Sequence, residues 1–113
     1  KPVPHGTAVA LVLPGVMRHN APAVADKYYF AAGAAGLELG GKSREAGIES
    51  MAGWIDGLRR RHTPYGSLAA AELGAEDIPR MVEIAMGVRR LLDPNPVAVE
   101  ETDAAAIYRS VLD

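Results

Sequence analysis

The chain of 113 residues contains no cysteine, few aromatic side chains (5%) and no long hydrophobic run. Without cysteine, disulfides, thiolate metal sites and a cysteine nucleophile are excluded. The longest apolar stretch, Ala8 to Met17, has roughly half the length that a membrane-spanning helix needs and contains Pro14. The net charge is −2, and acidic and basic residues are mixed along the chain, so a basic surface for nucleic acid is not expected. We therefore expect a cytoplasmic protein that binds neither nucleic acid nor membrane.

Alanine and glycine are abundant and β-branched residues are few, a composition typical of closely packed helices. Hydrophobic periodicity and turn signals indicate helices at residues 6–19, 20–36, 43–61, 74–92 and from Thr102 onward. Periodicity alone would also permit a buried strand at residues 8–13. We predict one all-α domain over residues 1–113, a compact bundle of about five to six helices.

Individual residues indicate where these helices begin and break. Pro14 should kink or interrupt the first helix, whose apolar residues on every side predict burial. We expect Asn20 or Ala21 to cap the second helix, Ser43 to cap the third and Thr102 to cap the last.

The residues that could carry chemistry do not form a site by spacing alone. His5 and His19 would lie about 21 Å apart along a continuous helix, too far to share one metal ion. His19 and His62 are interpreted as surface histidines near helix ends, and residues 59–61, all arginine, as cations that complement a helix dipole. No glycine-rich phosphate loop is present, so these patterns predict only a soluble helical domain.

A recognisable motif lies near the N-terminus. Residues 5–20 (HGTAVALVLPGVMRHN) are similar to the motif of iron-containing, group III metal-dependent alcohol dehydrogenases, in which His-Gly precedes Leu-Pro, Val-Met and Asn. Residues 26–28 resemble the Lys-Tyr helix of that family, and residues 76–79 and 95–96 resemble its later segments. The resemblance covers essentially the whole chain. It implies the C-terminal helical domain of the dehydroquinate synthase-like fold, without the N-terminal nucleotide-binding domain.

The resemblance also implies a chemistry and a site. Such enzymes transfer a hydride between NAD(P) and an alcohol or aldehyde, and one aspartate and three histidines hold iron (Fe²⁺) or zinc (Zn²⁺). His5 matches one of these histidines, and Leu91 and Leu92 fall where family members line the substrate pocket. The other ligands belong to segments before this chain. We therefore expect the chain alone to be inactive and to hold no cofactor tightly.

Two other interpretations remain open. The chain could be a free-standing helical interaction or dimerisation module that has lost catalysis, and a bare domain face would then favour a homo-oligomer. Alternatively it belongs to the glycerol dehydrogenase or dehydroquinate synthase-like branch. Val9 stands where the alcohol dehydrogenases usually have asparagine, which leaves the substrate open.

Overall fold

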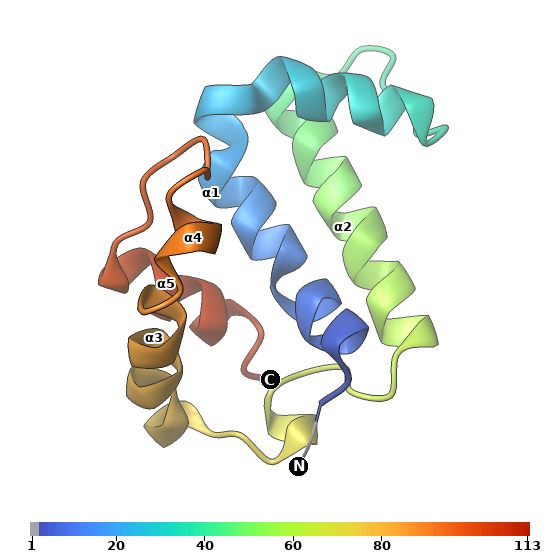
Figure 1. Ribbon diagram of the computed structural model, residues 1–113. Helices are drawn as coiled ribbons and strands as arrows, with labels where there is room; N and C mark the ends of the chain where they lie inside the picture. Colours follow the sequence, from blue (N-terminus) through green and yellow to red (C-terminus); the bar gives the residue numbers. More distant parts are fainter. Residues whose placement is uncertain (1–2) are drawn as a thin grey trace.

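The computed structural model describes residues 3–113, which form α-helices and two short 3-10 helices and contain no strand (Figure 1). In chain order the elements are α1 (His5–Ala34), α2 (Arg44–His62), η1 (Ala69–Ala71), η2 (Ala75–Asp77), α3 (Ile78–Met86), α4 (Arg89–Leu92) and α5 (Glu101–Ser110). The all-α prediction is therefore confirmed. The alternative of a strand at residues 8–13 is wrong, because this segment lies within α1.

The first two predicted helices are joined in α1, which bends at Val24. The φ of −131° and ψ of 30° at Val24 are not helical. Pro22 lies two residues before Val24 and has no amide hydrogen, so one hydrogen bond of the helix is missing next to the bend. The predicted break at Asn20 is therefore wrong. The predicted interruption at Pro14 is also wrong, since the backbone stays helical there and the proline ring is buried.

α1 and α2 form an antiparallel hairpin, and the second half of α1 crosses over the start of α2 (Figure 1). The predicted cap is confirmed, because Ser43 Oγ accepts a hydrogen bond from the Ala46 amide at 3.2 Å. The buried residues Ala32, Gly47 and Ala52 are small, which lets the two helix backbones approach closely.

Ion pairs tie the two helices together at the surface. Arg18 Nη2 lies 2.6 Å from Glu49 Oε1, and Arg18 Nε donates to both oxygens of the same carboxylate at 3.0 Å. The hydrogen bond from Arg18 lowers the pKa of Glu49 below its usual value.

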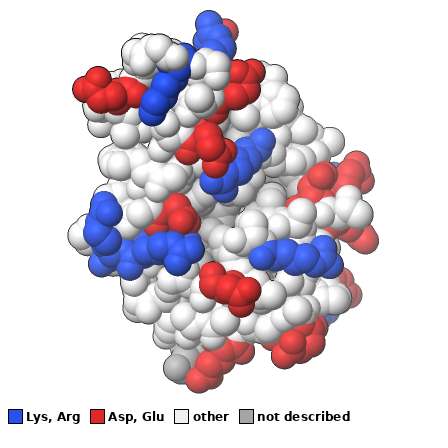
Figure 2. All heavy atoms as spheres, turned by 180° about the vertical axis from the view of Figure 1, so that it is seen from behind, with Lys and Arg blue, Asp and Glu red and all other residues white. Residues whose placement is uncertain are grey.

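Figure 2 shows basic and acidic side chains interspersed over the face seen from behind, so neither sign of charge dominates it.

α3, α4 and α5 form a second layer on the other side of α1 (Figure 1). One buried cluster joins Leu11 of α1 to Leu68 and Val111, and a second joins α3 to α5. Tyr108 and Leu112 pack against both clusters, so they connect the two parts of the core.

The predicted helix over residues 74–92 is divided in the structure. It consists of η2, α3 and α4, with a break at Val88, whose φ of −93° and ψ of 64° are not helical. Gly87, which has low helix propensity, precedes the break. The last helix begins at Glu101 rather than after Thr102, because Asp103 Oδ2 accepts a hydrogen bond from the Glu100 amide at 2.9 Å.

α1 is not buried on every side, contrary to the prediction from its apolar composition. Val9 is 44% exposed and Leu13 is 36% exposed. None of the helices in residues 3–113 combines the length and the apolar character that crossing a membrane would require.

Candidate functional site

His5, the predicted metal ligand, is the first residue of α1 and is exposed. The preceding residue, Pro4, accepts the first helical hydrogen bond through its carbonyl, from the Ala8 amide at 3.0 Å. This cap places the His5 imidazole at the open end of the helix, where a second domain or a ligand could reach it.

Among the residues that the structure describes, His5 has no partners that would complete a metal site. Across residues 3–113, no group of three His, Asp or Glu side chains is arranged to hold an ion. His19 lies on the same helix but about 21 Å further along its axis, and His62 lies at the end of α2. A single neutral imidazole is a suitable zinc or iron donor but not a site by itself.

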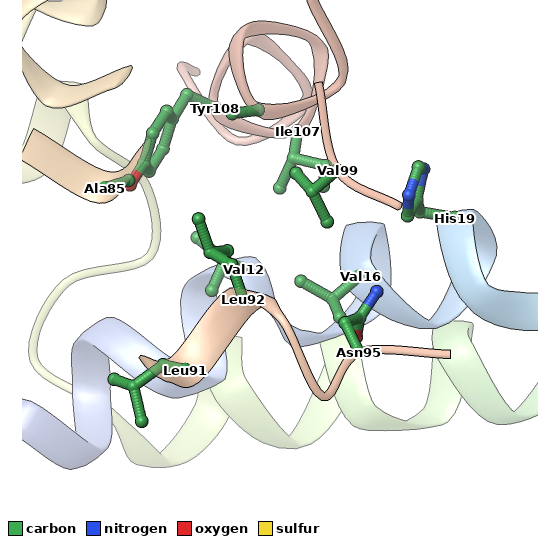
Figure 3. A pocket seen from close by; sticks show the side chains of 11 residues that line it. Val12, Val16, His19, Ala85, Leu91, Leu92, Asn95, Val99, Ile107 and Tyr108 are labelled. Atoms are coloured by element: carbon green, nitrogen blue, oxygen red, sulfur yellow. The ribbon is translucent and has the colours of Figure 1, made fainter. Parts of the chain in front are cut away.

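An apolar hollow lies between α1, α3, α4 and α5, and His19 lines it. Its volume is about 240 Å³ (Figure 3). The apolar lining residues come from α1, α3, α4, α5 and the loop before α5: Val12, Val16, Ala85, Leu91, Leu92, Val99, Ala104 and Ile107.

Both residues predicted to line a substrate pocket border this cavity. Leu92 is half-buried, whereas Leu91 is 66% exposed and lies at the mouth. Leu91 and Val12 lie at one end of the cavity, and Asn95 and His19 lie at the other (Figure 3). The structure thus brings Leu91 and Leu92 together at one cavity.

A pair of asparagines supports the loop at the far end of the cavity. Asn20 Nδ2 donates to Asn95 Oδ1 at 3.0 Å, and Asn95 Nδ2 donates to Asn20 Oδ1 at 2.7 Å. Asn95 Nδ2 also donates to the Val97 carbonyl at 2.6 Å. Asn20 is therefore a buried contact between α1 and the loop after α4, not the helix cap that its sequence position suggested.

His19 is not the surface histidine that the sequence predicted. It is half-buried and lines the cavity, with Nε2 3.0 Å from the Ala98 carbonyl and Nδ1 3.9 Å from Asp103 Oδ1. These contacts join α1 to the loop before α5 and to α5 itself. They form because α1 continues past His19 instead of ending there.

Tyr108 of α5 completes the cavity wall with its ring (Figure 3). Burial raises the pKa of the Tyr108 phenol above its usual value. The hydroxyl therefore stays protonated at neutral pH, and the residue presents an uncharged wall.

His5 lies on the same face of α1 as the cavity. Residues 5, 9, 12, 16 and 19 follow the spacing of one helical face, and Val12, Val16 and His19 all line the cavity. The rise from His5 to Val12 is about 10 Å. The exposed side chain of Val9 lies between them, so one face of α1 runs from the imidazole to the cavity.

Sequence reasoning missed the role of Arg59. This residue is buried, whereas Arg60 and Arg61 are exposed. Arg59 donates to Asp56 through Nε at 3.1 Å and also contacts Asp56 through Nη2 and the Gly66 carbonyl through Nη1. Asp56 precedes Arg59 by three residues, and this spacing is the signal that could have indicated the pair.

The cavity lining was only partly foreseeable. Val12, Val16 and His19 recur at helical spacing, but the apolar residues on all sides of α1 hid that stripe. Asn95 was visible in the sequence only within residues 95–96, which resemble a later segment of the family. Its pairing could not be foreseen, because its partner Asn20 lies 75 residues earlier.

The sequence was compared with models of protein families. Residues 2–112 match the model described as Fe-containing alcohol dehydrogenase family, C-terminal. The match covers nearly the whole chain and agrees with the all-helical structure. The chain therefore belongs to the Fe-containing alcohol dehydrogenase family and represents its C-terminal domain.

Proposed function

We propose that this chain is the helical half of an NAD(P)- and iron-dependent alcohol dehydrogenase. In this role His5 supplies one metal ligand, and Leu91 and Leu92 form part of the substrate-pocket wall. The observation that carries the proposal is the common face of α1, on which the exposed His5 imidazole is followed by the apolar cavity.

The chain's own residues have simple tasks in such an enzyme. The imidazole of His5 donates a lone pair from the first turn of α1, and Pro4 holds that turn through its carbonyl. The apolar walls of the cavity exclude water from the substrate. Lewis-acid polarisation of the substrate oxygen and acceptance of the hydride are the chemistry that a bound ion and a nicotinamide would supply.

The partner that the proposal requires is an N-terminal nucleotide-binding domain, which would supply the other ligands. The exposed apolar residues Val9 and Leu13, one helical turn apart on α1, support such a contact, because neighbouring exposed apolar side chains commonly mark an interaction surface. With one ligand, the chain alone should bind iron only weakly and should not turn over alcohols.

The test is a pair of substitutions in the enzyme that joins this chain to its nucleotide-binding domain. His5→Ala should remove most of the bound iron and lower alcohol oxidation, followed by NAD(P)H absorbance, by at least about 100-fold. His62→Ala is the matched control, since His62 is exposed at the end of α2, and it should leave both unchanged. Full iron content in His5→Ala would refute the assignment.

A second candidate function, a helical dimerisation module, is favoured by one observation. Phe30 is 79% exposed on the second half of α1, away from the cavity. If this residue serves a dimer, light scattering of the chain should give twice the monomer mass, and Phe30→Ser should return the monomer. A monomer at every concentration would eliminate this candidate.

A further inference from the structure

The second half of α1 has an outer face that stays exposed within residues 3–113. It lies at the edge of the molecule, with the start of α2 on its inner side (Figure 1). The inner side packs closely, because a Cβ atom at Gly47 of α2 would lie 2.8 Å from the Tyr29 ring. Four exposed residues follow the outer face at spacings of four, three and four: Ala23, Lys27, Phe30 and Ala34. We call this set the 23–34 stripe.

Phe30 and Lys27 are the two projecting side chains of the 23–34 stripe. Phe30 is 79% exposed. Lys27 makes no hydrogen bond or ion pair within the described part of the chain, whereas the adjacent Asp26 pairs with Arg44. A lysine ammonium is attracted by the negative face of an aromatic ring. The same part of the molecule already contains such a contact, since the Arg44 guanidinium carbon lies 5.6 Å from the centroid of the Tyr29 ring.

The 23–34 stripe is complementary to itself in one orientation. In an antiparallel pair related by a two-fold axis, each contact occurs twice. If Lys27 of one copy meets Phe30 of the other, equal separations along the chain bring Ala23 of one copy opposite Ala34 of the other. A parallel pair in register would instead place the two Lys27 ammonium groups against each other, which is unfavourable because their charges are alike. The antiparallel register therefore pairs cation with ring and small residue with small residue.

The length of the 23–34 stripe sets the strength of such a contact. The stripe spans about 17 Å of helix, at ~1.5 Å per residue. An interface of this length lies at the lower end of the sizes of specific protein contacts, so we expect a reversible dimer with a micromolar to millimolar dissociation constant. The small side chains of Ala23 and Ala34 let the two helix axes approach closely, which brings each ammonium within reach of the opposite ring.

We propose that two copies of this chain associate through the 23–34 stripe, antiparallel and two-fold symmetric, with Lys27 of each copy over the Phe30 ring of the other. The proposal rests on the dimerisation candidate above for the existence of a dimer, and it adds the orientation and the register of the contact. It does not require that catalysis is lost. The stripe begins about 27 Å along α1 from His5, so a dimeric enzyme would keep its metal ligand free of the contact.

The register is tested by exchanging the two facing side chains. Sedimentation velocity of the 113-residue chain, from about 10 μM to about 1 mM, gives the dissociation constant of the dimer. Phe30→Lys should raise this constant at least about tenfold, because each Lys27 ammonium then meets a second cation. The double variant, Lys27→Phe with Phe30→Lys, should return to within about threefold of the natural chain, since ring and cation have only exchanged places.

A matched pair of alanine substitutions locates the contact on the helix. Ala34→Glu places a carboxylate on the stripe, opposite Ala23 of the other copy, and should weaken the dimer about tenfold or more because the charge loses its hydration there. Ala35→Glu makes the same change one residue further, at the exposed end of α1 and off the stripe, and should leave the dissociation constant unchanged. Equal urea midpoints of the two variants at low concentration show that neither effect comes from unfolding.

A second exposed face of α1 provides the control for association elsewhere. Val9 and Leu13 lie one helical turn apart and are 44% and 36% exposed. Val9→Ser should leave the dissociation constant unchanged, because Val9 lies outside the 23–34 stripe. If Val9→Ser abolishes the dimer and Phe30→Lys does not, the two copies meet through the face of Val9 and the inference is wrong.

The outcomes separate this inference from both proposed functions. A monomer at every concentration overturns the inference and the dimerisation candidate together. A dimer that Phe30→Lys weakens, but that the double variant does not restore, overturns the inference and leaves the dimerisation candidate standing. The dehydrogenase proposal depends on the iron content of His5→Ala, which is measured independently of these variants.

Discussion

Asn20 on α1 and Asn95 after α4 exchange two amide hydrogen bonds, at 3.0 and 2.7 Å, across 75 residues of sequence. Asn20 is only 4% exposed, so its amide cannot exchange these bonds for water without local opening. The pair fixes the loop that carries the far wall of the cavity to the part of α1 just before its bend. Both the fold and the shape of the cavity therefore depend on the hydrogen bonds between Asn20 and Asn95.

We expect Asn20→Ala to lower the free energy of unfolding by about 1–3 kcal/mol, because it leaves the Asn95 amide without its partner. Asn95→Ala should have a similar effect. The double variant should cost less than the sum of the two, since both remove the same bonds. Urea denaturation of the three variants measures this, and additive effects would show that the pair is not coupled.

The carboxylate of Asp56 pairs with two arginines that differ in burial, so we expect the two pairs to contribute differently to stability. Asp56 accepts hydrogen bonds from both Arg59 and Arg60, but only Arg59 is buried. Asp56→Asn should lower the free energy of unfolding by about 3 kcal/mol, because it leaves the Arg59 cation buried without a counter-charge. Arg60→Ala, the control, should cost less than about 1 kcal/mol because that pair is exposed. Equal losses in thermal or urea unfolding would contradict this assignment.

The same carboxylate predicts a dependence of stability on pH. Desolvation, the largest single influence on Asp56, raises its pKa, but hydrogen bonds from Arg59 and Arg60 and their charges outweigh it, so the pKa lies below the usual 3.8. Arg18 likewise lowers the pKa of Glu49 from its usual 4.5. A carboxyl group whose pKa is lower in the folded than in the unfolded protein stabilises the fold. This stabilisation is complete at pH values above the pKa of the unfolded state, and it is lost as the pH falls through the pKa of the folded state.

The urea midpoint should therefore decline as pH drops below 4.5 and further below 3.8. Glu49→Gln should remove the part of this decline that comes from the Arg18 pair. A decline as steep in Glu49→Gln as in the natural chain would show that this pair does not contribute.

Two glycines of α2 should respond oppositely to alanine. A Cβ atom at Gly47 would lie 2.8 Å from Cε2 and 2.9 Å from Cδ2 of the Tyr29 ring, whereas at Gly53 it would meet nothing within 4 Å. Gly47→Ala should lower the unfolding free energy by about 1–3 kcal/mol through this clash. Gly53→Ala should raise it by up to about 1 kcal/mol through better helix propensity. Thermal unfolding of both variants measures the contrast, and stabilisation by both would mean that the helices separate readily at Tyr29.

Some features of the protein depend on near neighbours in the chain, and these could be predicted from its sequence. The cap at Ser43, the end of the helix before residues 93–96, and the helical character of the chain follow from local hydrogen bonds and propensity. The motif at residues 5–20 likewise predicted the family correctly.

Other features were decided by the tertiary structure, because they depend on contacts between residues far apart in the chain. Asn20 has the side chain of a helix cap, but the presence of Asn95 makes it a buried link within a helix that continues to Ala34. Arg59 lies in a run of arginines that is typical of a helix surface. In the structure its side chain is buried instead, where it contacts the Gly66 carbonyl and the Asp56 carboxylate. The cavity lies where α1, α3, α4, α5 and the loop before α5 meet, and no local pattern specifies how these elements leave space between them.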